Sequence, residues 1–200
     1  MKATRKLLSF LPALSLCLTL LPKAALAAVY PKPEITDLHV GAHDGTKIEE
    51  NMYYVVGADG KVSKENANEA NYNIYYQDQK LTLRDAHLMD FLLVPGGTTI
   101  ELIGDNFSGS LDQEVSIGIQ GVTPGSITIT GEGTYTVYSE GEGIFTPVKD
   151  DGDAKSDIII SGGTLDMQGS SIGTRYGGLT ITGNAKVTAG VISTGGDPNF

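Results

Sequence analysis

The sequence predicts an all-β protein: a right-handed parallel β-helix of about five coils, the last ones short or open, behind an N-terminal β-hairpin cap. One apolar–polar phrase closed by glycine occurs three times, at residues 127–131, 158–162 and 179–183. Weaker versions precede it at residues 81–85 and 100–104. The closing positions 85, 104, 131, 162 and 183 are separated by 19, 27, 31 and 21 residues. A repeat of this size, with strand patterning in each unit, is typical of a solenoid.

Residues 1–27 are expected to be a secretory signal. They have a basic start, an apolar stretch at residues 7–21 and the cleavage sequence Ala-Leu-Ala at residues 25–27. Cleavage would remove Cys17, the one cysteine in the chain, so the exported domain would hold no disulfide. We therefore expect a secreted, cell-surface or cell-wall protein with no membrane span after cleavage.

The charge of the exported domain limits the classes of partner that it can bind. Removing four basic residues and no acidic ones takes the formal net charge from −10 to −14. Such a domain is a poor candidate for nucleic acid or anionic lipid. It suits neutral polysaccharide, cations, or acidic polysaccharide bridged by a cation, although the charge also simply favours solubility.

Residues 28–80 are expected to form a lead-in followed by the cap. The strand pattern at residues 52–56 is followed by the turn sequence Asp59-Gly60. A second turn at residues 78–80 separates two further apolar stretches. A solenoid needs such a cap, because its first coil would otherwise present bare strand edges.

Residues 81–200 are assigned to the β-helix. Apolar residues of each phrase alternate with threonine or serine, which places one face toward a core and the other toward water. The outward hydroxyl row is Thr128, Thr130, Ser161, Thr180 and Thr182. Further short strands are expected at residues 134–137, 164–167 and 186–189, and at residues 115–119, 142–145, 171–174 and 191–194. A β-sandwich is the alternative fold, but it would not explain the recurring phrase.

The long coils carry insertions at residues 107–114 and 149–157. Insertions in a solenoid map to loops on one side, where function is most often found. The second insertion holds four carboxylates in a glycine-containing loop: Asp150, Asp151, Asp153 and Asp157. Hard cations prefer several carboxylate oxygens on a flexible loop, so these residues are candidate Ca²⁺ ligands. A solvated acidic loop is the alternative.

Aromatic side chains are the candidate sugar contacts, because their faces stack on the apolar faces of pyranose rings. The chain has no tryptophan. Adjacent tyrosines in a strand place one ring inward and one outward, and we expect Tyr54 and Tyr76 to be the outward members of their pairs. Tyr176, with Arg175 beside it, completes the candidate carbohydrate-binding set.

Three stretches resemble a known family. Residues 51–83, residues 94–102 (Val-Pro-Gly-Gly-Thr-Thr-Ile-Glu-Leu) and residues 158–196 are similar to the exported "carbohydrate-binding domain-containing" β-helix proteins of cellulolytic and gut bacteria. The resemblance implies a pectate-lyase-like fold, non-catalytic binding of plant-type polysaccharide including acidic sugars, and calcium held in the helix.

Catalysis has little support in the sequence. Polysaccharide lyases on this fold use an exposed Arg or Lys as base beside carboxylate-bound calcium, and the expected exported domain has only Arg84 and Arg175 as arginines. We expect an exported, non-catalytic polysaccharide-binding protein, assisted by Ca²⁺. One alternative is a calcium-dependent lyase acting on acidic polysaccharide. Another is a structural or adhesive module that self-associates through its open C-terminal coil.

Overall fold

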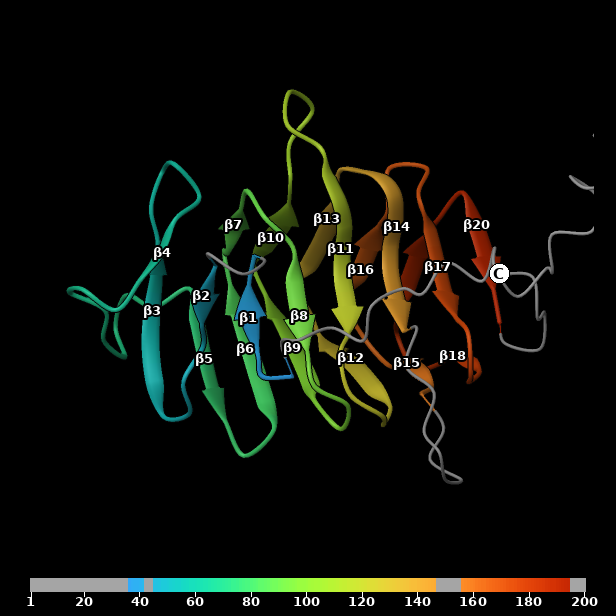
Figure 1. The fold of residues 1–200 in the computed structure, drawn as a ribbon, viewed down its shortest axis with the longest axis horizontal. Coiled ribbons are helices and arrows are strands. Elements are labelled where there is room, and N and C mark those ends of the chain that lie inside the picture. Colours follow the sequence, from blue (N-terminus) through green and yellow to red (C-terminus); the bar gives the residue numbers. More distant parts are fainter. Residues whose placement is uncertain (1–35, 42–44, 147–155, 195–200) are drawn as a thin grey trace, which may run out of the picture. The chain divides into compact units, whose positions relative to one another are not determined.

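Three β-sheets make up the described part of the chain. The computed structural model describes residues 36–41, 45–146 and 156–194, and within these ranges no residue lies in a helix. The ribbon in Figure 1 shows the strands of successive turns side by side. None of the described residues belongs to a helix that could cross a membrane. The expected all-β class with parallel sheets is confirmed, and the arrangement is compatible with a parallel β-helix.

Neighbouring strands within each sheet come from distant parts of the chain. In spatial order, the seven-stranded sheet comprises β2 (Thr46–Lys47), β1 (His39–Val40), β8 (Leu92–Val94), β11 (Val115–Gly121), β14 (Ser139–Thr146), β17 (Ser171–Thr174) and β20 (Val191–Ser193). The five-stranded sheet comprises β19 (Lys186–Thr188), β16 (Thr164–Asp166), β13 (Thr134–Val137), β10 (Asp105–Ser108) and β7 (His87–Leu88). The eight-stranded sheet comprises β18 (Leu179–Ile181), β15 (Ile158–Ile160), β12 (Ile127–Gly131), β9 (Thr99–Ile103), β6 (Lys80–Arg84), β5 (Ile74–Gln77), β3 (Met52–Val56) and β4 (Val62–Ser63).

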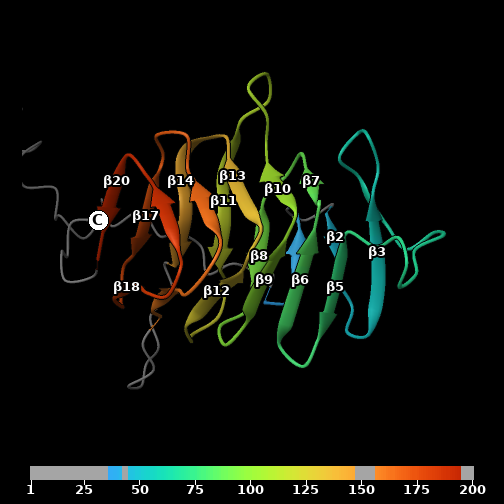
Figure 2. The same ribbon diagram turned by 180° about the vertical axis from the view of Figure 1, so that it is seen from behind.

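Pairing from β6 to β20 follows one rule. Each strand pairs in parallel with the strand three places further along the chain, so β6 pairs with β9, β7 with β10 and β8 with β11. Figure 2 shows the same stack from behind, with β6 and β9 next to each other. Two parallel strands must be joined by a crossover of about a dozen residues or more. In this chain the crossover contains the two intervening strands, which belong to the other two sheets.

The repeated phrases form strands of the eight-stranded sheet. Their pairing register is not the one in which the first residues of the phrases would face each other. Ile100 pairs with Ile129, and Leu102 pairs with Gly131. The phrase at residues 127–131 is therefore displaced by two residues, which keeps its isoleucines on the inner face because side chains alternate with a period of two. Gly131 has φ +103, and a Cβ there would lie 2.3 Å from the Leu102 carbonyl oxygen. Only glycine allows this approach.

The antiparallel strands of this sheet lie at its N-terminal end. β5 pairs with both β3 and β6, and β3 pairs with β4, all in antiparallel orientation. The turn between β5 and β6 contains Asp78 and Gln79, both with positive φ (49° and 60°). Two-residue hairpins favour this geometry because its twist matches that of the flanking strands.

The core lies between the sheets and is mostly apolar, with Tyr54 and Tyr135 among its largest fully buried side chains. Asn106 is a polar exception, 1% exposed. Its Oδ1 accepts a hydrogen bond from the Ala86 N–H at 2.9 Å, and its Nδ2 donates to the Ile103 and Thr134 carbonyls, both at 3.1 Å. The side chain thus ties three neighbouring turns together.

Burial declines along the stack toward β20. The side chains of Ile158 and Ile160 are fully buried, while Ile181, which pairs with Ile160, is 44% exposed. Val191 and Ile192 in β20 are 58% and 53% exposed. Ile181 and Ile192 continue the inner rows, because they pair with the buried Ile160 and Ile172, and no described residue covers them. Val191 pairs with Ser171 and lies on the outer face.

Candidate functional site

The outer face of the eight-stranded sheet carries a row of side chains in register across five strands. In spatial order this central row is Tyr53, Tyr75, Thr82, Glu101 and Thr130. Directly opposed side chains on neighbouring strands lie close enough to touch, so the pairing register alone brings these residues together. The hydroxyl row predicted from the sequence lies outward as expected, with Thr128 and Thr130 half-buried and Thr180 and Thr182 exposed.

Three tyrosines gather at the N-terminal end of the central row. Tyr53 and Tyr75 are paired across β3 and β5, and their rings are stacked with centroids 4.5 Å apart and planes 20° apart. Tyr72, from the loop before β5, is tilted against both, with centroids 5.2 Å from Tyr53 and 5.9 Å from Tyr75. All three are half-buried, so part of each ring remains accessible.

Arg84 completes this tyrosine cluster, which we define as Tyr53, Tyr72, Tyr75 and Arg84. Its Cζ lies 4.0 Å from the centroid of the Tyr72 ring, and its Nη2 donates a hydrogen bond to the Tyr72 hydroxyl at 2.9 Å. A guanidinium held over an aromatic face has a fixed orientation. Asn73 fixes the backbone around it, accepting from the Val56 N–H and donating to the Arg84 carbonyl.

The phenol of Tyr53 stays protonated over a wide pH range. Burial among its neighbours raises its pKa above the ordinary value, and the nearby charge of Glu69 raises it further. A protonated phenol keeps both a donor and an acceptor for a ligand hydroxyl.

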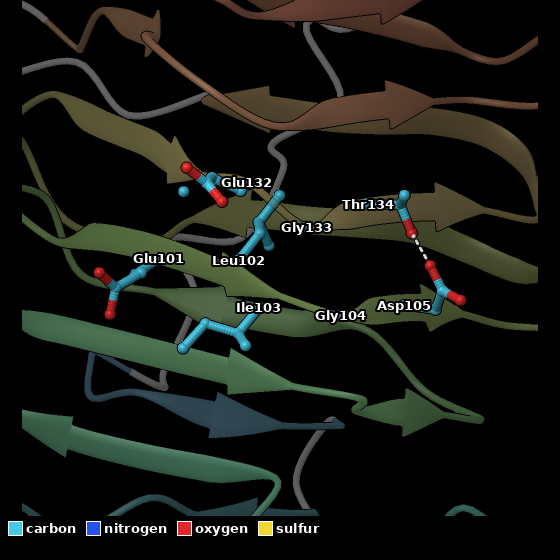
Figure 3. Close-up of a pocket in the computed structure, with 9 residues that line it drawn as sticks. Glu101, Leu102, Ile103, Gly104, Asp105, Glu132, Gly133 and Thr134 are labelled. Carbon is cyan, nitrogen blue, oxygen red and sulfur yellow. Dashed lines mark hydrogen bonds between the residues drawn. The ribbon is translucent and has the colours of Figure 1, made fainter.

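Beyond the tyrosines, the central row becomes polar. Glu101 lies 2.8 Å from the Lys80 ammonium, and the Thr82 hydroxyl donates to the same carboxylate at 3.4 Å. Glu101 also marks the edge of a surface hollow of about 540 Å³, lined by Glu101, Leu102, Ile103, Gly104, Asp105, Gly131, Glu132, Gly133 and Thr134. Figure 3 shows Glu101, Glu132 and Asp105 around this hollow, with the Thr134 hydroxyl bonded to Asp105 at 3.0 Å. Within the described ranges, no three His, Cys, Asp or Glu side chains are grouped closely enough to hold a metal ion.

The structure reverses the expected facing of the tyrosine pairs. Tyr54 is fully buried, and its hydroxyl accepts from the Glu49 N–H and donates to the Lys47 carbonyl. Tyr76 is half-buried and packs against the core. Their strand partners explain this, because Tyr54 pairs with Ile74 and Tyr76 with Leu81, both inner-face residues. The outward members are Tyr53 and Tyr75.

Arg175 and Tyr176 directly follow β17. Figure 1 shows β17 far along the stack from β3 and β5, the strands that carry Tyr53 and Tyr75. Tyr176 is 42% exposed and Arg175 is half-buried, with its N–H bonded to the Thr146 carbonyl. The structure does not bring these two residues together with Tyr54 or Tyr76 at one site.

Of the four candidate calcium ligands, Asp150, Asp151 and Asp153 lie outside the described residues. Asp157 is described, and its carboxylate accepts a hydrogen bond from the Gly178 N–H at 2.6 Å. Its carbonyl oxygen accepts from the Ile127 N–H. In the described part of the chain, therefore, Asp157 serves to join neighbouring turns.

Sequence reasoning did not single out Tyr72 and Arg84 as partners. Arg84 lies two residues after Thr82 and so faces the same side of the sheet. Tyr72 precedes β5 and reaches Arg84 only through the antiparallel pairing of β5 with β6. A register prediction for that hairpin, based on its two-residue turn, could have found the pair.

Comparison of the chain with protein-family models, with curated proteins and with solved structures finds no match. The resemblance to carbohydrate-binding β-helix proteins therefore stays an expectation from the sequence.

Proposed function

We propose that this chain is an exported, non-catalytic polysaccharide-binding protein, built as a right-handed parallel β-helix of about five coils with an N-terminal hairpin cap. The parallel pairing of every third strand supports the β-helix. The observation that carries the function is the tyrosine cluster, with Tyr53 stacked on Tyr75 and Arg84 held over Tyr72 on the outer face of a sheet. Rings of this kind, flanked by fixed donors, suit the apolar faces and hydroxyls of sugars.

Retention on polysaccharides tests this function. The protein is passed over insoluble cellulose, pectin and xylan, with and without a chelator. We expect retention on at least one of them, and Tyr75→Ala should weaken it by up to about tenfold, since an aromatic contact contributes about 0.5–1.5 kcal/mol. Tyr176→Ala is the matched control, because that exposed ring lies elsewhere in the stack.

The same experiment separates the other candidates. Loss of retention with chelator would support the calcium assistance proposed for Asp150, Asp151, Asp153 and Asp157. Release of unsaturated products from polygalacturonate would replace the binding function with lyase activity. If no polysaccharide retains the protein, or if Tyr176→Ala rather than Tyr75→Ala abolishes retention, the tyrosine cluster is not the site.

A second candidate function, self-association as a structural or adhesive module, has one observation in its favour. Ile181 and Ile192 belong to the inner rows, yet they are exposed among the described residues. Two copies joined through β18, β19 and β20 would bury them. Ile192→Lys should then lower a concentration-dependent mass measured by light scattering; a mass that stays monomeric at all concentrations contradicts this candidate.

A further inference from the structure

The tyrosine cluster and the hollow lie on one line across the eight-stranded sheet. The central row begins at Tyr53 on β3 and reaches Glu101 on β9, where the wall of the hollow begins. Glu101 therefore belongs to both features. A ligand that covers the tyrosines and extends along the row toward β12 meets the hollow next.

The length of this line can be derived from the sheet. Four strand-to-strand steps separate Tyr53 from Thr130, so the row spans about 19 Å at about 4.8 Å per step. A pyranose unit of an extended chain is about as long as one such step, so a chain along the whole row has roughly four or five units. It passes over Thr82, which its neighbours leave only 6% exposed. The strands are in register, which keeps the spacing of contacts constant along the row.

The two ends of the row differ in charge. The tyrosine end carries the Arg84 guanidinium, and no described carboxylate forms an ion pair with it. At the hollow end the charge of Glu101 is balanced by Lys80, 2.8 Å away, so the negative charge comes from the exposed Glu132 and Asp105. Carboxylates accept hydrogen bonds but donate none. They match the hydroxyls of an uncharged sugar, and they repel a sugar that carries its own carboxylate.

We infer that the central row is a track for one linear glycan of four or five units running across the strands, with uncharged sugars at the hollow end. This inference rests on the proposed function and adds to it the direction of the chain, its length and the charge of its sugars. The tyrosines stack on the first units, and the carboxylates of Glu101 and Glu132 accept hydrogen bonds from the hydroxyls of the last.

Calorimetric titration with cello-oligosaccharides of one to six units tests the track. The affinity should rise with each unit up to four or five and then level off.

Glu132→Ala should weaken binding of the pentamer by about tenfold and leave binding of the dimer unchanged, because only the longer chain reaches the hollow. Tyr75→Ala should weaken binding of every length. Asp112→Ala, an exposed carboxylate on the loop between β10 and β11, is the matched control and should change nothing. Circular dichroism confirms that each variant is folded.

Two results would overturn the track while leaving the proposed function intact. In the first, the affinity stops rising at two sugar units. Glu132→Ala then has no effect on the affinity, while Tyr75→Ala still weakens it. The other is tighter binding of oligogalacturonates than of neutral oligosaccharides of five units. If neither series binds at any length, the track fails. The proposed function fails with it only if cellulose, pectin and xylan also do not retain the protein.

Discussion

At the residue scale, Asn106 shows how one polar side chain can support the stacking of neighbouring turns. It stands at an inner-face position, where it pairs with the buried Tyr135 of β13 and accepts a hydrogen bond from the Ala86 N–H. An apolar side chain there would leave the Ala86 N–H without its partner, since Asn106 Oδ1 accepts that bond. The cost of a buried polar atom without a partner explains why asparagine stands in an otherwise apolar row.

We predict that Asn106→Ala lowers the free energy of unfolding by about 3 kcal/mol, because several buried backbone groups lose a partner at about 1–3 kcal/mol each. Asn106→Asp should be as harmful, since a carboxylate cannot donate to the Ile103 and Thr134 carbonyls. Urea denaturation measures both, with the exposed Asn68→Ala as control. A loss below about 1 kcal/mol would mean that water replaces the side chain.

The buried phenol of Tyr135 predicts a loss of stability at alkaline pH. Burial raises its pKa above the ordinary value of 10.0, and the hydrogen bond with Ser108 only partly opposes this. Above about pH 10 the unfolded chain releases this proton while the folded chain keeps it. The contribution of this group to stability is therefore complete below that pH and falls as the pH rises, by about 1.4 kcal/mol per pH unit.

Thermal unfolding between pH 8 and 11 measures this slope. Tyr135→Phe should flatten it, and combining Tyr135→Phe with Ser108→Ala should keep the flat profile without an unpartnered serine hydroxyl. An unchanged slope in both variants would assign the alkaline loss to other groups, such as Tyr53, whose pKa is also raised.

At the element scale, the hairpin of β5 and β6 determines where the tyrosines point. Its turn places Gln77 opposite Lys80, and this register continues to Tyr75 opposite Thr82. A slip of one residue would turn Tyr75 inward and Tyr76 outward. The positive φ of Asp78 and Gln79 maintains this register, at some cost for residues that are not glycine.

We predict that Gln79→Gly raises the free energy of unfolding by up to about 1 kcal/mol, because glycine adopts a positive φ without steric strain. Gln79→Val should lower it, since a β-branched residue is strained at this φ. Chemical denaturation compares the two with Ser116→Val, an exposed position in β11 that should be nearly neutral. A destabilised glycine variant would show that side-chain contacts of Gln79 outweigh backbone strain.

The sequence predicted the elements of the stack better than it predicted the candidate site. The alternation in residues 127–131 was sufficient to place Ile127 and Ile129 in the core, because the apolar face of a strand is buried. Two adjacent tyrosines carry no such signal, since either can be the inner one. The choice between Tyr53 and Tyr54 depended on the pairing of β3 with β5, a contact between residues distant in sequence.

At the scale of the whole described stack, stability should fall from the middle toward β20. Strands β9 and β12 have partners on both sides and buried side chains, whereas β18, β19 and β20 are edge strands with exposed ones. Local opening is easiest where few buried contacts oppose it. We predict that backbone amides in β18 and β20 exchange with deuterium at least about tenfold faster than those in β9 and β12.

Hydrogen exchange followed by mass spectrometry, at two protein concentrations, measures this gradient. If β18 and β20 are protected as strongly as β12 at the high protein concentration but not at the low one, a second copy covers them. Equal protection at every concentration would contradict the gradient.

The position of β6, antiparallel to β5 and parallel to β9, has a consequence for how the chain folds. The β5–β6 hairpin closes a two-residue turn, whereas the pairing of β6 with β9 must first close a loop of many residues, at a larger entropic cost. The hairpin should therefore form early and offer a ready edge to which β9 adds, then β12. During synthesis it also leaves the ribosome before any parallel partner exists. Folding would then proceed in one direction, from the ribosome-distal hairpin toward β20, with each finished turn serving as the template for the next.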